Sequence, residues 1–282
     1  MARNTIEDLC ARLERTQKSR PIGRVIAAGG SCVRVAGLAG SAAIGDQVRL
    51  ARIGCGGEIV DIAGDALTVL ADGDYSGLRM GDSVRWAGPP MIAPDDSWVG
   101  RIIDAAGAPL DGRPLRSGPI ARTLRSPAPS AVMRRPLGPR LSTGLAAFDT
   151  LLPLVRGQRI GLFSGSGVGK SMLLSQFAGG VESDVCVVAL IGERGRELRS
   201  FVEDALGPEK LARTVVIAAT SDAPPVMRRR ALWTAMTVAE HFREGGKHVL
   251  FLADSVTRFA EAHREIALAA GESASLRGYP PS

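Results

Sequence analysis

The chain has few aromatic residues, few cysteines and no long apolar run. Phe, Trp and Tyr make up 4% of its 282 residues, so a core must be built mainly from Val, Leu, Ile and Ala, which suits buried parallel strands. The four cysteines are far apart, with neither CxxC spacing nor nearby histidines, which indicates neither a metal site nor a disulfide framework. No apolar run approaches the roughly 20 residues of a membrane-spanning helix, and the polar N-terminus lacks the apolar core of a cleavable signal.

The net charge does not indicate a nucleic-acid partner. The formal net charge is +6 and the isoelectric point is near 9.6, but the basic residues are scattered among acidic ones instead of forming blocks. With 45% hydrophobic and 23% charged residues, the composition is that of a globular protein, and the length allows about two domains. We expect no nucleic acid among the partners.

A glycine-rich stretch at 164–171 follows the apolar run at 159–163. A strand, a glycine-rich turn and a helix start in this order form a phosphate-binding loop, because the turn lets backbone N–H groups converge on phosphate oxygens. Ser164 stands where the usual pattern has glycine. We expect Lys170 to reach the β- and γ-phosphates and the Ser171 hydroxyl to bind Mg²⁺. The predicted nucleotide-binding residues are Gly165, Ser166, Gly167, Val168, Gly169, Lys170 and Ser171.

The sequence before this loop divides into two parts. Residues 1–20 predict a short amphipathic helix with an apolar stripe at Ile6, Leu9 and Leu13, which packs on its own domain or docks to another protein. Residues 21–90 contain short β-like runs separated by glycines, which predicts a small closed barrel. The barrel has few aromatic residues for stacking bases, which favours a structural or oligomerising role.

Residues 91–282 predict a nucleotide-binding domain of alternating strands and helices. Residues 109–139 are rich in proline and arginine and read as a connector loop. Strands alternating with helices imply a parallel sheet that is covered on both faces, with ligands beyond the carboxyl ends of its strands. The expected strands are 158–163, 185–191, 214–219 and 248–253, and the expected helices are 169–178, 197–206, 225–243 and 258–269.

Two further strand ends carry acidic residues. Asp254 ends the apolar strand before it and is the expected second partner of Mg²⁺, although a helix cap is the alternative role. Glu193 is the candidate for orienting the attacking water, and Arg194 for adding positive charge toward the γ-phosphate. The alternative for the segment is a solvated ion-pair network that opens a helix, and we favour this alternative for Arg196 and Glu197.

Taken together, these segments resemble the rotary and export ATPases related to the F-type catalytic subunit, and most of all the flagellum-specific ATPases of bacterial type III export. The resemblance rests on the phosphate loop and on residues 99–104, 107–112, 143–149, 192–197, 221–225, 254–259, 264–272 and 277–282. It implies a RecA-like P-loop sheet and the hydrolysis of ATP with Mg²⁺. The family continues past the last segment into an arginine used by a neighbouring subunit and a C-terminal helical domain, so we interpret the chain as C-terminally truncated.

The resemblance also implies partners and alternatives. It implies a hexameric ring, cytoplasmic and peripheral to the inner membrane, at the export gate with its chaperones and substrates. The N-terminal helix is expected to bind a stator-like regulatory protein. An ATPase of virulence-type secretion shares every motif used above. A non-catalytic ring subunit lacks the carboxylate at Glu193, and a hexameric helicase needs the aromatic stacking set that the barrel lacks.

Overall fold

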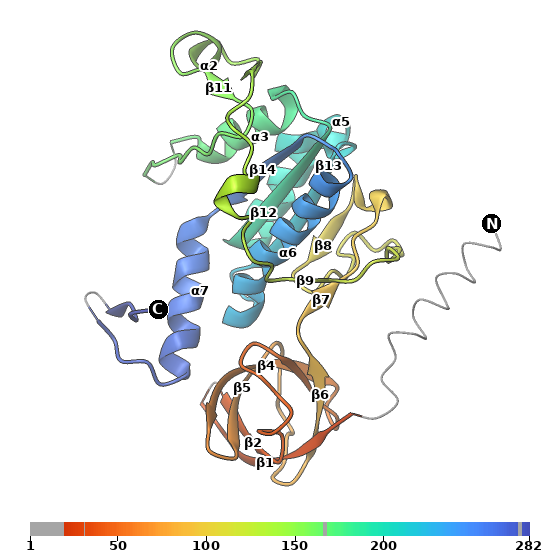
Figure 1. Cartoon of the computed structure of the whole chain (residues 1–282), viewed down its shortest axis with the longest axis vertical. Coiled ribbons are helices and arrows are strands. Elements are labelled where there is room, and N and C mark those ends of the chain that lie inside the picture. The colour runs from red at the N-terminus through yellow and green to blue at the C-terminus, as the bar shows by residue number, and fades with distance from the viewer. Residues whose placement is uncertain (1–19, 31, 166–167, 276–277) are drawn as a thin grey trace, which may run out of the picture.

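The computed structural model describes residues 20–30, 32–165, 168–275 and 278–282, so the predicted N-terminal helix lies outside the described residues (Figure 1). Six antiparallel strands close into a barrel in the order β1-β2-β5-β4-β3-β6. In β2, Val33 and Val35 are buried while Arg34 between them is exposed, the alternation expected of a strand with one face in a core. The strands are β1 (Ile22–Gly29), β2 (Cys32–Ala36), β3 (Gln47–Leu50), β4 (Cys55–Ala63), β5 (Ala66–Ala71) and β6 (Ser83–Gly88).

The second part of the chain is built on a four-stranded parallel sheet. Its order is β14-β12-β13-β8, and the strands are β8 (Ile102–Asp104), β12 (Val185–Glu193), β13 (Thr214–Thr220) and β14 (Val249–Asp254). The helices that accompany the sheet are α3 (Lys170–Gly180), α4 (Gly195–Ser200), a π-helical turn over Phe201–Leu206, α5 (Gly207–Leu211), α6 (Pro225–Glu244) and α7 (Val256–Ala269). The predicted α/β sheet and the predicted barrel are both confirmed.

The two faces of β12 enter two different hydrophobic clusters. Val187 and Ile191 pack with α6, whereas Val188 and Leu190 pack with α3 and the π-helical turn. All four side chains are at most 3% exposed. A strand that is buried on both faces reads as a continuous apolar run, which is how the segment appears in the sequence.

Short elements connect the barrel to the sheet. The strands β7 (Met91–Ile92) and β9 (Arg122–Thr123) pair with each other, and the predicted connector at 109–139 has little regular structure apart from β9 and one 3-10 turn. Figure 1 shows the barrel at one end of the molecule, with α7 running from the sheet toward it. The remaining elements are the 3-10 turns Asp96–Trp98 and Ala131–Met133, β10 (Arg140–Leu141), α2 (Ala146–Thr150) and β11 (Leu154–Val155).

The predicted strand at 158–163 is wrong for this structure. The segment has no regular structure, and Phe163 is 97% exposed. A parallel strand needs a partner edge, but β11 pairs with β10 in a separate two-stranded sheet just before this segment. In the part of the chain that the structure describes, the outer edge of β14 pairs with no strand.

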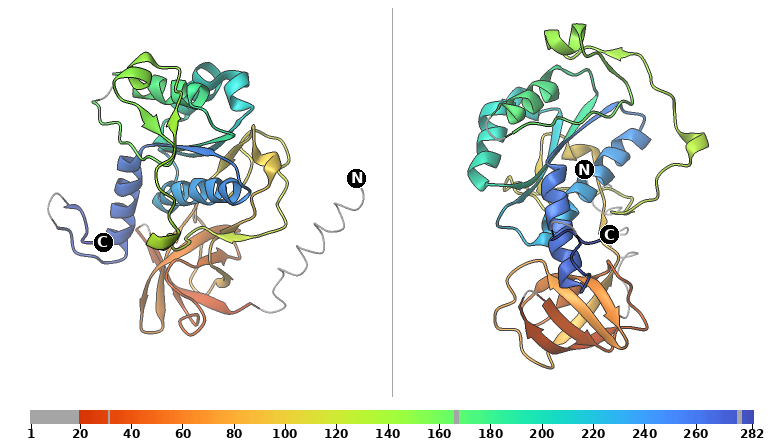
Figure 2. Two further views of the ribbon diagram at one scale, coloured as in Figure 1. Left: turned by 45° about the horizontal axis from the view of Figure 1, so that its top comes forward. Right: turned by 90° about the vertical axis from the view of Figure 1, so that its left-hand side faces the viewer.

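The barrel packs against the two helices α6 and α7. Val60 and Leu70 on the barrel form one buried cluster with Val226 of α6 and Ile266 of α7. The views in Figure 2 agree that the far end of α7 lies against the barrel. Among the described helices, none combines the length and the apolar character that a membrane crossing requires.

The end of α3 depends on a close backbone approach. A Cβ atom on Gly180 would lie 2.1 Å from the carbonyl oxygen of Thr143, which is fixed backbone and not a movable side chain. Gly144 beside it has a φ of +71°, so this loop also needs glycine on its own side. The contact holds residues 143–145 against α3.

We therefore expect Gly180→Ala to lower the free energy of unfolding by about 1–3 kcal/mol, as overpacking does. Urea-induced unfolding followed by circular dichroism measures the change. Gly195→Ala in α4 is the matched control, because nothing lies within 4 Å of a Cβ atom at that position. Equal stabilities of the two variants would contradict the close approach.

Candidate functional site

The phosphate-loop segment leads directly into α3. Gly169 has a φ of +91° and caps the helix, and its carbonyl oxygen accepts from the N–H of Leu173 at 3.0 Å. This left-handed conformation favours glycine. The free N–H groups of the first turn give the helix a positive end that attracts anions. Gly165 and Val168 are exposed beside it, and the predicted Ser166 and Gly167 lie outside the described residues.

The structure brings the first residue of α3 to the last residue of β14. Lys170 Nζ lies 2.6 Å from Asp254 Oδ1. Asp254 is 4% exposed, and Lys170 supplies the positive partner that such a buried carboxylate requires. The ion pair therefore joins the phosphate loop to the carboxyl end of the neighbouring strand, as expected for two parts of one site.

The residues at this point fit a magnesium ion. Asp254 Oδ1 is buried and receives no aligned hydrogen bond within the described residues, because its contact with Lys170 is an ion pair without hydrogen-bond geometry. Its lone pairs remain available to a metal-bound water. The exposed Ser171 begins the same helix turn as Lys170. One hydroxyl and one carboxylate are a usual protein share for Mg²⁺, which keeps waters and takes phosphate oxygens for its other ligands.

A bulge sets the position of Glu193. In the ladder between β12 and β13, Ile191 pairs with Ala219 and Glu193 pairs with Thr220, so Gly192 is an extra residue. Gly192 has a φ of +69°, which permits the bulge. The carbonyl oxygen of Glu193 accepts from the N–H of Ser221 at 2.9 Å, which anchors the backbone just beyond the bulge.

The Glu193 carboxyl holds its proton more tightly than an ordinary glutamate. Burial, a hydrogen bond shared with Glu197 and the negative charge of Asp254 raise the pKa of Glu193 from 4.5 to about 7. Arg258 acts in the opposite direction and lowers this pKa. A carboxyl whose pKa lies near neutrality can accept a proton at physiological pH, which is the requirement for a general base.

Two arginines near this carboxyl have different environments. The side chain of Arg258 lies against Gly192, since a Cβ atom on that glycine would be 3.2 Å from the Cβ atom of Arg258. Arg194 is mostly exposed and forms an ion pair with Glu197 at 3.2 Å, three residues further along the helix start. That pair is the ion-pair alternative considered for the segment, and the role of Arg194 at the γ-phosphate stays a prediction.

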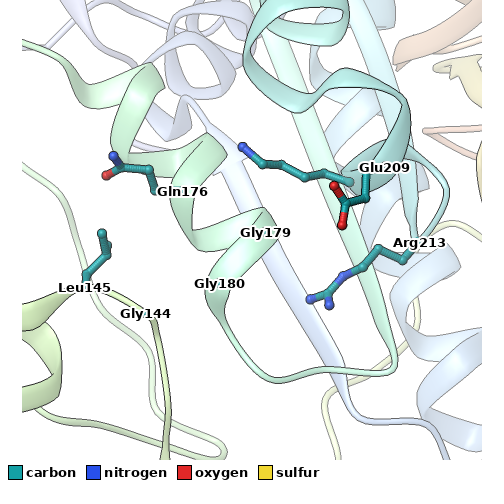
Figure 3. Close-up of a pocket in the computed structure, with 8 residues that line it drawn as sticks. Gly144, Leu145, Gln176, Gly179, Gly180, Glu209 and Arg213 are labelled. Atoms are coloured by element: carbon teal, nitrogen blue, oxygen red, sulfur yellow. The ribbon is translucent and has the colours of Figure 1, made fainter.

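A cavity of about 400 Å³ lies at the other end of α3 (Figure 3). With 11 residues, α3 is about 16 Å long, so the cavity is distant from the phosphate loop. Lys210 donates to Ser175 and to the carbonyl oxygen of Ala205, so its charge is already engaged. The cavity is lined by Gly144, Leu145, Gln176, Gly179, Gly180, Glu209, Lys210 and Arg213. We place the candidate site at the loop and not in this cavity.

The structure thus brings Lys170, Asp254 and Glu193 to one edge of the sheet, and Asp254 acts on Glu193 electrostatically. Sequence reasoning missed the part played by Gly192 and Arg258. Arg258 belongs to a segment that supported the resemblance, but its contact with Gly192 joins two elements that are distant in sequence. A glycine directly before the acidic strand end was the available signal for the bulge.

Residues 144–282 match the ATP synthase alpha/beta family, nucleotide-binding domain. This half of the chain is therefore a nucleotide-binding domain of that family. The domain includes every residue of the candidate site.

The particular relatives are flagellum-specific ATP synthases and type 3 secretion system ATPases, which confirms the resemblance. A flagellum-specific ATP synthase of Caulobacter vibrioides is 41% identical over 98% of this chain and 64% of its own length. A type 3 secretion system ATPase of Xanthomonas euvesicatoria is 39% identical over 93% of this chain and 60% of its own length. The assembled ATPase EscN of enteropathogenic E. coli, solved with its central stalk EscO, matches with a TM-score of 0.86 and 37% identity over 92% of this chain and 64% of its own. The chain thus spans under two thirds of the length of these relatives.

The site geometry predicts that Lys170 binds nucleotide phosphate. Lys170→Gln removes the charge beside Asp254, and we expect it to weaken the binding of MgATP by about tenfold or more, or about 1.4 kcal/mol. Isothermal titration calorimetry measures the dissociation constant.

Lys210→Gln is the matched control, because Lys210 lines the cavity at the opposite end of α3. We expect this variant to keep the affinity of the unmodified chain. If Lys210→Gln weakened binding and Lys170→Gln did not, the nucleotide site would lie in the cavity.

Proposed function

We propose that this chain is the nucleotide-binding part of an ATPase whose Mg²⁺-dependent hydrolysis of ATP energises flagellar type III protein export. The observation that carries the proposal is the site edge, where Lys170 pairs with the buried Asp254 and Glu193 stands nearby with a pKa of about 7. Binding alone requires the loop and its lysine. Hydrolysis also requires a base, and Glu193 has the properties of one.

Each residue has one role in the proposed reaction. Lys170 and the N–H groups at the start of α3 hold the phosphates. Ser171 and Asp254 hold Mg²⁺, which when bound supplies positive charge against the phosphate oxygens. Glu193 orients a water molecule and accepts its proton as the water oxygen bonds to the γ-phosphorus, while the bond from this phosphorus to the β–γ bridging oxygen breaks and ADP leaves. Arg194 is proposed to add charge at the γ-phosphate after leaving Glu197.

The assembly is part of the proposal. We infer a homohexameric ring in the cytoplasm, peripheral to the inner membrane, that acts at an export gate with chaperones and export substrates. The similarity to EscN, which was solved as an assembled ATPase with its central stalk, supports an oligomer that has a regulatory partner. The N-terminal helix, outside the described residues, is proposed to bind a stator-like protein.

Injectisome secretion is the second candidate. The Xanthomonas relative and EscN belong to type III secretion systems and match the chain at 39% and 37% identity, close to the 41% of the Caulobacter flagellar relative. Flagellar or injectisome genes beside the coding sequence separate the two. Restored swimming of a mutant that lacks its flagellar ATPase, on expression of this protein, favours the flagellar function.

Glu193→Gln tests the proposed base. We expect it to lower the kcat for ATP hydrolysis by about 100-fold or more with the nucleotide affinity retained, because the amide keeps the shape but accepts no proton. A coupled assay of phosphate release measures the rate. Glu203→Gln is the control, since Glu203 is exposed, pairs with Arg199 and is not among the groups that shift the pKa of Glu193. Unchanged turnover in Glu193→Gln would remove Glu193 from the mechanism.

The pH dependence follows from the same carboxyl. The base acts when deprotonated, so kcat should rise as the pH rises through about 7, the pKa of Glu193. The raised pKa has the opposite effect on folding, because the folded chain holds the proton between pH 4.5 and about 7. The contribution of Glu193 to stability is therefore present below pH 4.5 and is lost as the pH rises through about 7. Unfolding of Glu193→Gln and the unmodified chain, compared across this range, measures it.

A further inference from the structure

One buried carboxylate joins the barrel to the helices of the nucleotide-binding domain. Glu58 of β4 is 1% exposed, and its two oxygens accept from two neighbouring arginines of α6. Arg229 Nη2 donates to Oε1, and Arg230 Nη2 donates to Oε2 at 3.1 Å. Arg230 also lies 3.8 Å from Asp72 of the barrel. This pairing crosses from one part of the fold to the other.

The arginines at this part of α6 also contact α7. Arg229 Nη1 lies 3.2 Å from His263 Nδ1, and the Arg229 guanidinium lies 4.8 Å from the ring centre of Trp233. Arg228 donates to Glu265 at 2.8 Å. An arginine presents a planar fork of donors, so one side chain can fix two acceptors at once. Glu58 therefore orients α6 and α7 together.

Both helices begin at the candidate site. The loop before α6 holds Glu193, through the hydrogen bond from the Ser221 N–H to the Glu193 carbonyl oxygen, and Arg228 Nε donates to Ala223 of this loop at 3.0 Å. The helix α7 begins two residues after Asp254, and its first turn carries Arg258 against Gly192. The arginines that donate hydrogen bonds to Glu58 are thus within two helical turns of the segment that holds Glu193.

We propose that Glu58 is a positioning residue for the nucleotide site: its carboxylate fixes α6 and α7 on the barrel, and the two helices carry the Glu193 loop and Arg258. The inference rests on the nucleotide binding proposed above. It extends the site to a residue of the barrel. Coupling between two sites is reciprocal, so a nucleotide that moves the helix starts also alters the environment at the junction.

Trp233 reports on this junction. It stacks with Arg229 and with Arg125 at 5.0 Å, and it meets Phe259 of α7 edge to face at 6.2 Å. The chain has three tryptophans. Labelling with 5-fluorotryptophan gives each a fluorine resonance, which single Trp→Phe variants assign. The Trp98 resonance serves as a reference.

The test adds MgADP to the labelled chain while calorimetry records binding. We expect the Trp233 resonance to shift in the unmodified chain. In Glu58→Gln we expect MgADP to bind and the Trp233 shift to be lost. Asp111→Asn is the matched control, because it neutralises another largely buried carboxylate, 2.6 Å from Arg101, which within the described residues bonds to neither α6 nor α7. Asp111→Asn should keep the shift.

A second variant covers the case in which Glu58→Gln does not fold, since removing one partner of a buried ion pair is costly. Arg229→Lys keeps the positive charge, but its single ammonium does not span Glu58 and His263. We expect it to lose the Trp233 shift as well. A Trp233 shift that persists in the folded variants, or is absent from the unmodified chain with MgADP bound, overturns the role of Glu58. No binding of MgADP to the unmodified chain overturns the proposed function and this inference together.

Discussion

The structure depends on β12, the strand that is buried on both faces. Its alternate side chains enter two separate hydrophobic clusters, one under α6 and one under α3. Because β12 lies between β14 and β13 and all three are parallel, their carboxyl ends meet at one edge. Loss of either cluster would free a helix that begins at this edge. The positions of Lys170, Glu193 and Asp254 therefore follow from the packing of apolar residues that have no chemistry of their own.

The charges at this edge balance one another. Two carboxyl groups, Asp254 and Glu193, lie close enough to interact; Asp254 is buried and Glu193 is partly buried. Lys170 forms a direct ion pair with Asp254, whereas burial, the hydrogen bond with Glu197 and the charge of Asp254 outweigh Arg258 and raise the pKa of Glu193 to about 7. One edge thus holds a carboxylate in an ion pair and a carboxyl that titrates near neutrality, which suit metal binding and proton transfer respectively.

The sequence was informative where chemistry follows a local pattern. Residues that are neighbours in the sequence were enough to predict three features. These are the loop before α3, the acidic residues at the ends of β12 and β14, and the barrel. The predicted strand at 158–163 failed because an apolar run does not say whether its segment will reach a sheet edge: the outer edge of β14 is unpaired within the described residues, yet 158–163 forms no strand on it. Glu58 and Arg229 are 171 positions apart, and no local sequence pattern predicts such a pair. Arg194 forms an ion pair with Glu197 because residues three positions apart lie on the same face of a helix.

The buried Glu58 also bears on how such a chain can be recombined. By chain path, the barrel ends with β6 and looks like a module that could be exchanged as a whole. A different barrel of the same shape would nevertheless leave Arg229 and Arg230 without a counter-charge unless it supplied a carboxylate at the same point. The barrel and the first turns of α6 must therefore be exchanged together. These two segments are adjacent in space but separate in sequence.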